Sequence, residues 1–208
     1  MKPQVVVFDL GKVLLDFDYS IAAHRIAERS RAGLDEARLF IDQSPLLHRY
    51  ETGLVTTHEF FAEIRQLSGF SGTEDEFAGF FGDIFTPIAP MIQLHAELRQ
   101  RGIPTYIFSN TNDLAISHIR RRFPFFANFD GYIFSYEHRS MKPDARLYEV
   151  VEKETGSKGA AIVYLDDRLE NVQAGAARGW QTVHHETPEK SRAVLERLEL
   201  LTDRNAGV

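Results

Sequence analysis

Three apolar, strand-forming runs of this 208-residue chain end on polar side chains that could do chemistry. The residues at these ends are Asp9, then Ser109 with Asn110, and then Asp166 with Asp167. A fourth run, at 131–135, leads into a turn that carries Lys142. In a parallel sheet the carboxyl ends of the strands meet at one edge, where ligands bind. The sequence therefore predicts that these side chains form one site.

The residue types at this predicted site suit a metal ion and a phosphate group. Carboxylates gathered at one edge repel each other unless a cation lies between them, and a hard divalent cation such as Mg²⁺ prefers oxygen ligands. A lysine and a hydroxyl beside them suit a phosphate, which can also bridge to the metal. Taken singly, each residue has a structural alternative as a helix cap, a turn residue or a solvated surface side chain. Taken together, they favour a site.

The elements around these residues alternate between strands and helices. Apolar runs predict strands at 5–8, 104–110, 131–135, 160–167 and 180–185. The segments that precede or separate the later strands predict helices at 91–101, 112–122, 143–154 and 170–178. Strands separated by helices of this length form right-handed crossovers and a parallel sheet that is covered on both faces. We therefore expect an α/β core domain with a Rossmann-like, doubly wound parallel sheet, made from residues 1–15 and 91–208.

Residues 16–90 interrupt this alternation with a helical segment. Apolar residues recur there at helical spacing, and Thr56 with Glu59 forms the capping-box pattern of a helix start. No strand is expected between residues 19 and 90. The segment is predicted to be a small helical cap domain, inserted after the first strand.

Composition limits the classes of function. The net charge of −6 argues against a broad nucleic-acid surface. The chain has no cysteine, which excludes thiolate nucleophiles and cysteine metal sites and fits a reducing compartment. No secretory leader and no apolar run of roughly 18 residues is visible. We expect a cytoplasmic protein with neither membrane nor nucleic-acid partners, and the sequence leaves its oligomeric state open.

Four motifs carry a resemblance to a known family. They are FDLGKVL, IFSNT, MKPDARLY and YLDDRLENVQAGAARG, in this order along the chain. With them the chain resembles the haloacid dehalogenase (HAD) superfamily over essentially its whole length. The resemblance implies the α/β core described above, with residues 16–90 as the cap. Within the superfamily, the chain is similar to small bacterial phosphatases with a DLGxV loop, including one that acts on α-D-glucose 1-phosphate.

The resemblance also implies catalytic roles. Asp9 corresponds to the nucleophile that attacks phosphorus and becomes an aspartyl phosphate. Ser109 and the backbone N–H of Asn110 correspond to the groups that bind the phosphoryl oxygens. Lys142 corresponds to the cation that holds both the nucleophile and the phosphoryl group. The implied activity is that of a phosphatase, a phosphoric monoester hydrolase, acting on a small-molecule phosphate ester such as a sugar phosphate.

The resemblance to the superfamily also implies a Mg²⁺ cofactor. Asp9, the backbone carbonyl of Gly11 and Asp167 correspond to the direct ligands of the metal. Asp166 corresponds to an outer-sphere partner. Because Asp166 and Asp167 are both acidic, the metal motif is complete in this chain.

The chain departs from the family pattern at Gly11. Most phosphatases of the superfamily have a second aspartate there, which protonates the leaving oxygen and then activates water. Loss of a general acid/base costs ~10²–10⁴-fold in rate unless another group replaces it. By position, Asp16 and Asp18 are candidates for a substitute, although they also suit a turn and a helix N-cap. The role of Lys12, where glycine or asparagine is more usual, is not explained by the sequence.

Two alternative functions follow from this departure. One is hydrolytic dehalogenation of a 2-haloacid, because the enzymes that catalyse it also lack the second aspartate. The acidic pair Asp166–Asp167 argues against this function, because those dehalogenases need no metal. The other is a catalytically impaired binding protein on the same fold. The cap is expected to determine substrate choice, with residues such as His48, Tyr50 and Glu51 as candidates for the pocket lining.

Overall fold

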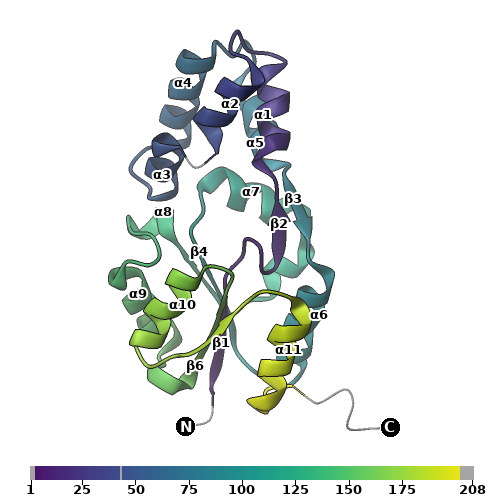
Figure 1. The fold of residues 1–208 in the computed structure, drawn as a ribbon, viewed down its shortest axis with the longest axis vertical. Coiled ribbons are helices and arrows are strands. Elements are labelled where there is room, and N and C mark those ends of the chain that lie inside the picture. Colours follow the sequence, from purple (N-terminus) through teal and green to yellow (C-terminus); the bar gives the residue numbers. More distant parts are fainter. Residues whose placement is uncertain (1–2, 43, 202–208) are drawn as a thin grey trace.

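A five-stranded parallel sheet, in the order β5-β4-β1-β6-β7, forms the centre of the α/β part of the molecule (Figure 1). The computed structural model describes residues 3–42 and 44–201. The strands are β1 (Val5–Phe8), β4 (Thr105–Ser109), β5 (Gly131–Phe134), β6 (Ile162–Asp166) and β7 (Gln181–His184). Each strand pairs with its neighbours in parallel. The predicted α/β, Rossmann-like fold class is confirmed.

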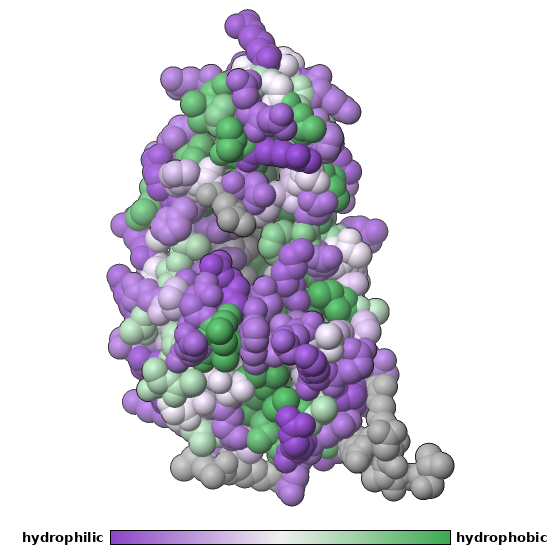
Figure 2. Space-filling model, in the orientation of Figure 1, coloured by the Kyte–Doolittle hydropathy of each residue, from purple (hydrophilic) through white to green (hydrophobic). Residues whose placement is uncertain are grey.

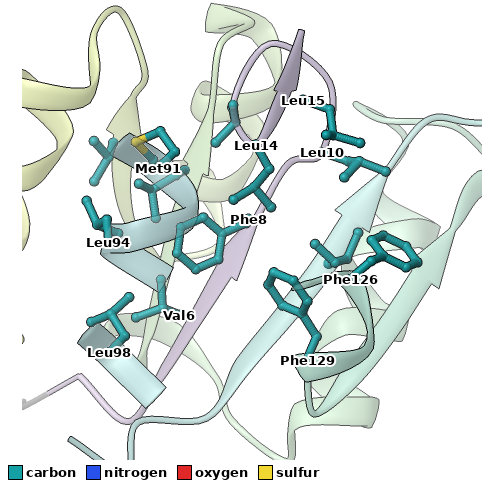
Figure 3. Packing of buried hydrophobic residues seen from close by; sticks show 14 of the residues in the cluster. Val6, Phe8, Leu10, Leu14, Leu15, Met91, Leu94, Leu98, Phe126 and Phe129 are labelled. Atoms are coloured by element: carbon teal, nitrogen blue, oxygen red, sulfur yellow. The ribbon is translucent and has the colours of Figure 1, made fainter. Parts of the chain in front are cut away.

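Strand β1 lies in the middle of the sheet and is buried on both faces. Val6 and Phe8 belong to one hydrophobic cluster, and Val5 and Val7 belong to another on the opposite face. Figure 3 shows Val6 and Phe8 beside α6, where Leu94 also lies. Four consecutive apolar residues are therefore needed, because a centrally placed parallel strand exposes neither face to water.

Helices cover both faces of the sheet (Figure 1). Those that contribute to the Val6 and Phe8 cluster are α6 (Ala89–Gln100), α7 (Asp113–Arg122) and α11 (Pro188–Arg197). Those on the opposite face are α9 (Ala145–Thr155) and α10 (Leu169–Ala177). Three short helical turns complete this part: η1 (Pro124–Asn128), α8 (Ser135–His138) and η2 (Gly159–Ala161).

The inserted segment is helical and has a hydrophobic cluster of its own. Its helices are α1 (Tyr19–Ala27), α2 (Leu34–Ile41), α3 (Pro45–Glu51), α4 (Thr57–Ser68) and α5 (Glu74–Gly82). The predicted capping box of Thr56 and Glu59 begins α4. The buried members of this cluster all lie between Ala22 and Ile84. This separate cluster supports our proposal that residues 16–90 form a cap module on a core of residues 1–15 and 91–208.

An antiparallel ribbon of two short strands joins the helical insert to the sheet. Strand β2 (Leu15–Phe17) carries the chain into the insert, and β3 (Phe85–Pro87) carries it back. The prediction that residues 19–90 contain no strand is therefore wrong at β3. Three residues are too few to show the alternation of a strand, and the proline among them is tolerated because β3 is an edge strand.

None of the helices in the described parts of the chain is long and apolar enough to cross a membrane.

Candidate active site

The carboxyl ends of β1 and β6 bring three carboxylates together. Asp9 directly follows β1, Asp166 is the last residue of β6, and Asp167 follows it. One oxygen atom from each carboxylate lies within 4.8 Å of the others. The structure thus places these three predicted residues in one cluster at the sheet edge.

Lys142 contacts two of the three carboxylates, Asp9 and Asp166. Its ammonium group is 3.0 Å from Asp9 Oδ1 and 2.6 Å from Asp166 Oδ2, and its side chain is 1% exposed. The same group donates a hydrogen bond of 3.0 Å to the carbonyl of Phe108, at the end of β4. All three donors of the ammonium group are therefore used, and Lys142 is held rigidly against the nucleophile position.

Asp166 is held by several donors. Its carboxylate accepts hydrogen bonds from the Tyr164 hydroxyl, from the backbone N–H of Arg168 at 2.8 Å and from Asn171 Nδ2 at 3.0 Å. Asp166 is fully buried and has lost its hydrogen bonds to water. These protein hydrogen bonds replace them. Asp166 thus lies behind the cavity and orients Lys142, whereas Asp167 is partly exposed.

The electrostatics of this cluster are strongly perturbed. Burial, together with the charges of Asp166 and Asp167, raises the pKa of Asp9 to about 8 against the opposing effect of Lys142. Burial and the charge of Asp166 also raise the pKa of Asp167. For Asp166, burial acts to raise the pKa, but the charge and hydrogen bond of Lys142 lower it overall. The cluster therefore resists ionisation of all three carboxylates without further positive charge.

A divalent cation fits this cluster. When all groups are ionised, three carboxylates and one ammonium leave two uncompensated negative charges, which is the charge that one Mg²⁺ carries. The donors are oxygen atoms, as Mg²⁺ prefers. Asp9 and Asp167, with the carbonyl of Gly11, line the same cavity and are the groups we propose as ligands.

Replacing Asp167 by asparagine is expected to weaken Mg²⁺ binding at least about 10-fold, because the substitution removes a carboxylate ligand and one of the negative charges that attract the ion. Calorimetric titration of the purified protein with MgCl₂ measures this effect. Asp75→Asn, at an exposed position of α5, is the matched control and should bind Mg²⁺ as the unmodified protein does. Equal affinities for the two variants would remove Asp167 from the proposed site.

Ser109 and Asn110 lie at the edge of the same cavity. The Asn110 side chain makes two hydrogen bonds to the backbone of Lys142. Its Oδ1 accepts from the Lys142 N–H at 2.8 Å, and its Nδ2 donates to the Lys142 carbonyl at 3.0 Å. Asn110 thereby fixes the lysine loop to the end of β4. The Ser109 hydroxyl is available to a ligand, because among the described residues it makes only a long hydrogen bond, of 3.4 Å, to the Asn110 carbonyl.

The ring of Phe17 limits the space for a side chain at position 11, where this chain has glycine. A Cβ atom at this position would lie 2.8 Å from Cε1 of Phe17, which is closer than non-bonded carbon atoms approach. The ring of Phe17 therefore occupies the space that an aspartate side chain would need. An aspartate at position 11 would therefore require the Phe17 ring to shift.

Lys12 adopts a left-handed backbone conformation, with φ of 58°. Glycine and asparagine are favoured in this region, which explains why either is the more usual residue there. The Lys12 ammonium pairs with the Asp16 carboxylate, donates to the Phe17 carbonyl at 2.9 Å and lies 4.7 Å from the centre of the Phe17 ring. Lys12 therefore lines the cavity with its charge paired to Asp16.

Asp16 and Asp18, the two substitute acids suggested by the sequence, have other partners. Asp16 is exposed and paired with Lys12, and the hydrogen bond from Lys12 lowers its pKa. Asp18 is the N-cap of α1, where its side chain accepts from the Ser20 N–H at 2.8 Å. Neither of them is among the residues that line the cavity.

A cavity of about 410 Å³ lies above the acidic cluster, between the sheet edge and the helical insert. Its floor contains Asp9, Ser109, Lys142 and Asp167, and its opposite wall comes from the insert, with Tyr19, Leu47, His48 and Glu51 among the lining residues. On the face drawn in Figure 2, hydrophilic side chains predominate around the junction of the two parts. The volume suits a small organic ligand.

Several lining residues were not predicted from the sequence. Tyr19 and Asp42 come from separate parts of the insert, and only the packing of the insert onto the sheet edge brings them to the cavity, whereas Arg168 directly follows Asp167 within the acidic motif. Asn171 was quoted within the acidic motif, but its bond to Asp166 was not foreseen. A polar residue on the apolar side of α10, one turn after the strand end, is the signal that could have identified it.

Comparison with known proteins agrees with this geometry. The family model of the haloacid dehalogenase-like hydrolases matches residues 3–179. The chain belongs to this hydrolase family. The predicted family membership is thereby confirmed, and the four motifs quoted from the sequence all lie within the matched residues.

Individual relatives of this HAD-family hydrolase include two phosphatases. The sesquiterpene phosphatase astK of Aspergillus oryzae is 26% identical over 184 residues, which are 87% of this chain and 89% of the relative. The D-ribitol-5-phosphate phosphatase of Bacteroides thetaiotaomicron is 24% identical over 194 residues, 87% of this chain and 91% of the relative. Both alignments span nearly the full length of each protein.

Among solved structures, a HAD family enzyme from Bacteroides thetaiotaomicron, in complex with magnesium and inorganic phosphate, superposes on this hydrolase with a TM-score of 0.76. The alignment covers 87% of this chain and 93% of that chain, at 21% identity. At this identity the superposition establishes the shared fold.

Proposed function

We propose that this hydrolase is a Mg²⁺-dependent phosphatase that acts on a small phosphate monoester through an aspartyl-phosphate intermediate on Asp9. The observation that carries the proposal is the buried Lys142, in contact with both Asp9 and Asp166, within a cluster of three carboxylates below a cavity. A cation, a lysine and a carboxylate nucleophile at one point match the needs of phosphoryl transfer, which depends on positioning and charge neutralisation.

The residues on the cavity floor divide the work of the first step. Lys142 Nζ and the backbone N–H of Leu10 both bind Asp9 Oδ1, so Asp9 Oδ2 is the oxygen that attacks phosphorus. The Ser109 hydroxyl and the N–H of Asn110 bind the phosphoryl oxygens. The bond from phosphorus to the leaving oxygen breaks as the bond to Asp9 forms.

Water completes the reaction in a second step. It attacks phosphorus from the cavity side, the bond between phosphorus and Asp9 breaks, and the carboxylate and inorganic phosphate are regenerated. A bound Mg²⁺ supplies neutralisation of the charge on the phosphoryl oxygens and on the carboxylates. Lys142 stays protonated throughout, because the charges of Asp166 and Asp9 raise its pKa, although burial acts to lower it.

The substrate class follows from the cavity and from the relatives. A sesquiterpene phosphatase and a ribitol-phosphate phosphatase both act on small phosphorylated molecules, as their names state. The cavity of about 410 Å³ is of a size for a sugar phosphate or a comparable metabolite. We also propose a cytoplasmic location, as the sequence predicts.

Dehalogenation of a 2-haloacid is the principal alternative, because Gly11 stands where the second aspartate of most family phosphatases would be, and the dehalogenases also lack that aspartate. The partly exposed Asp167 beside Asp9 argues against it, since a haloacid carries a carboxylate that Asp167 would repel without a metal.

Phosphate release tests the proposal. We expect the purified protein to hydrolyse p-nitrophenyl phosphate, and at least one member of a panel of sugar phosphates, in the presence of Mg²⁺. Addition of EDTA should abolish turnover, and Mg²⁺ in excess should restore it. Release of chloride from 2-chloropropionate, with no ester hydrolysed, would instead favour the dehalogenase.

A further inference from the structure

The proposed phosphatase lacks the aspartate that usually moves the proton, and the residue that replaces it must lie on the insert side of the cavity. In-line displacement places the leaving oxygen opposite Asp9 across the phosphorus atom. Asp9 is on the floor, so the leaving oxygen faces the wall that the insert provides. The attacking water of the second step occupies the same place. A single group on that wall can therefore serve both steps.

Among the described residues of the insert, four titratable side chains line this wall: Tyr19, Asp42, His48 and Glu51. Asp42 and His48 are exposed to solvent, whereas Tyr19 and Glu51 are partly buried. We infer that Glu51 is the general acid and base of this phosphatase, in place of the aspartate missing at Gly11. This inference rests on the phosphatase function proposed above.

The position of Glu51 is fixed from both sides of the junction. Its backbone carbonyl, at the end of α3, accepts a hydrogen bond of 2.6 Å from the Ser135 hydroxyl at the sheet edge. Two residues later, the α3–α4 turn passes so close to α8 that a Cβ atom at Gly53 would lie 2.1 Å from the carbonyl of Tyr136. These contacts between insert and core fix the backbone at Glu51, and its side chain lines the cavity.

The surroundings of Glu51 suit proton transfer near neutral pH. Burial raises the pKa of Glu51 to about 7, against the smaller opposing effects of the Tyr19 hydrogen bond and the Arg168 charge. The Tyr19 hydroxyl lies 3.4 Å from Glu51 Oε1, and its own pKa is raised by burial, so it stays a donor. The other titratable or charged residues that line the cavity with Glu51, among those described, are Lys12, Asp42, His48 and the floor residues Asp9, Lys142 and Asp167.

The proton balance is simple. In the first step the carboxylic acid of Glu51 gives its proton to the leaving oxygen as the phosphorus–oxygen bond breaks, so that an alcohol departs. In the second step the Glu51 carboxylate takes a proton from the attacking water while the phosphorus–Asp9 bond breaks. Glu51 ends the cycle protonated, as it began.

The test is Glu51→Gln, assayed with p-nitrophenyl phosphate and Mg²⁺. The substitution preserves size and the acceptor for Tyr19. The p-nitrophenolate anion leaves without a proton, so the first step should proceed and release about one equivalent of p-nitrophenolate in a burst. The second step should slow by ~10²–10⁴-fold, and the acid-quenched variant should carry a phosphoryl group on Asp9.

The pH dependence gives a second readout. Where the second step limits the rate, wild-type turnover should fall as the pH drops below about 7, because the base becomes protonated. With an alkyl phosphate, where the first step limits, turnover should fall as the pH rises above about 7, because the acid is lost. The Glu51→Gln variant should show neither the fall in turnover below about pH 7 nor the fall above it.

Glu63→Gln, at a partly exposed glutamate of α4 that pairs with Arg49 and lies outside the cavity, is the matched control and should behave as wild type. Wild-type rates without a burst in Glu51→Gln would overturn the inference and leave the phosphatase function standing. A ~10²–10⁴-fold loss in Asp16→Asn or Asp18→Asn instead would assign the role to the residue suggested by the sequence. Absence of any wild-type turnover would overturn the proposed function, and this inference with it.

Discussion

Replacing Asp9 by asparagine is expected to lower phosphatase turnover by at least about 10⁴-fold, the largest effect of any single substitution. The amide is a poor nucleophile for phosphorus, and Asp166, the other carboxylate in contact with Lys142, does not line the cavity. Steady-state release of phosphate from p-nitrophenyl phosphate, with Mg²⁺ present, measures the loss. The variant should fold, because the amide oxygen can still accept from Lys142 and from the Leu10 N–H.

Asp75→Asn makes the same chemical change on the exposed surface of α5 and should retain full turnover. If Asp9→Asn kept more than a small fraction of wild-type activity, Asp9 would not be the nucleophile. The mechanism would then need direct attack of water on the substrate.

Replacing Lys142 by methionine is expected to reduce both stability and activity. Methionine fills a similar volume but leaves Asp166 buried without its cation, and breaking a buried ion pair on one side costs about 3–5 kcal/mol. Urea denaturation followed by circular dichroism measures the free energy of unfolding. We expect turnover to disappear as well, because Lys142 positions Asp9 and neutralises the phosphoryl group.

The matched control is Lys190→Met, at an exposed lysine of α11 that pairs with Glu186. Its free energy of unfolding should change by less than about 1 kcal/mol, because exposed ion pairs contribute little. Equal destabilisation by the two substitutions would contradict the account of Lys142 as the charge that makes burial of Asp166 tolerable.

The core of the site could be predicted because strand ends are local features. Val5–Phe8 is a buried strand by its own composition, and a parallel sheet brings the ends of such strands to one edge. Asp9, Lys142 and Asp166 were therefore expected together, and in the structure they are in contact. The sheet order and the register of each strand pair needed the structure.

The opposite wall of the cavity could not be predicted in the same way. Glu51 was named only as a candidate lining residue, since its place depends on the Ser135 hydrogen bond and on the close approach at Gly53, which join segments far apart in the sequence. Lys12 was unexplained for the same reason. Its left-handed backbone and its contact with Phe17 arise from the turn between β1 and β2.

The departure at Gly11 shows how one substitution depends on a neighbour. The sequence alone indicates a lost acid/base, whereas the structure adds that a Cβ atom at position 11 would lie 2.8 Å from the Phe17 ring. Restoring an aspartate at position 11 would therefore require Phe17 to move. This coupling gives a physical reason to look for the proton donor on the insert.

The most direct test of the account is the detection of the phosphoryl group on Asp9. Enzyme mixed with p-nitrophenyl phosphate and Mg²⁺ is quenched in acid during turnover, digested and analysed by mass spectrometry, with Glu51→Gln used to accumulate the intermediate. The account predicts a phosphorylated peptide that contains Asp9, and its absence in Asp9→Asn. Active turnover with no phosphoryl group on any peptide, or with the group on another residue, would contradict it.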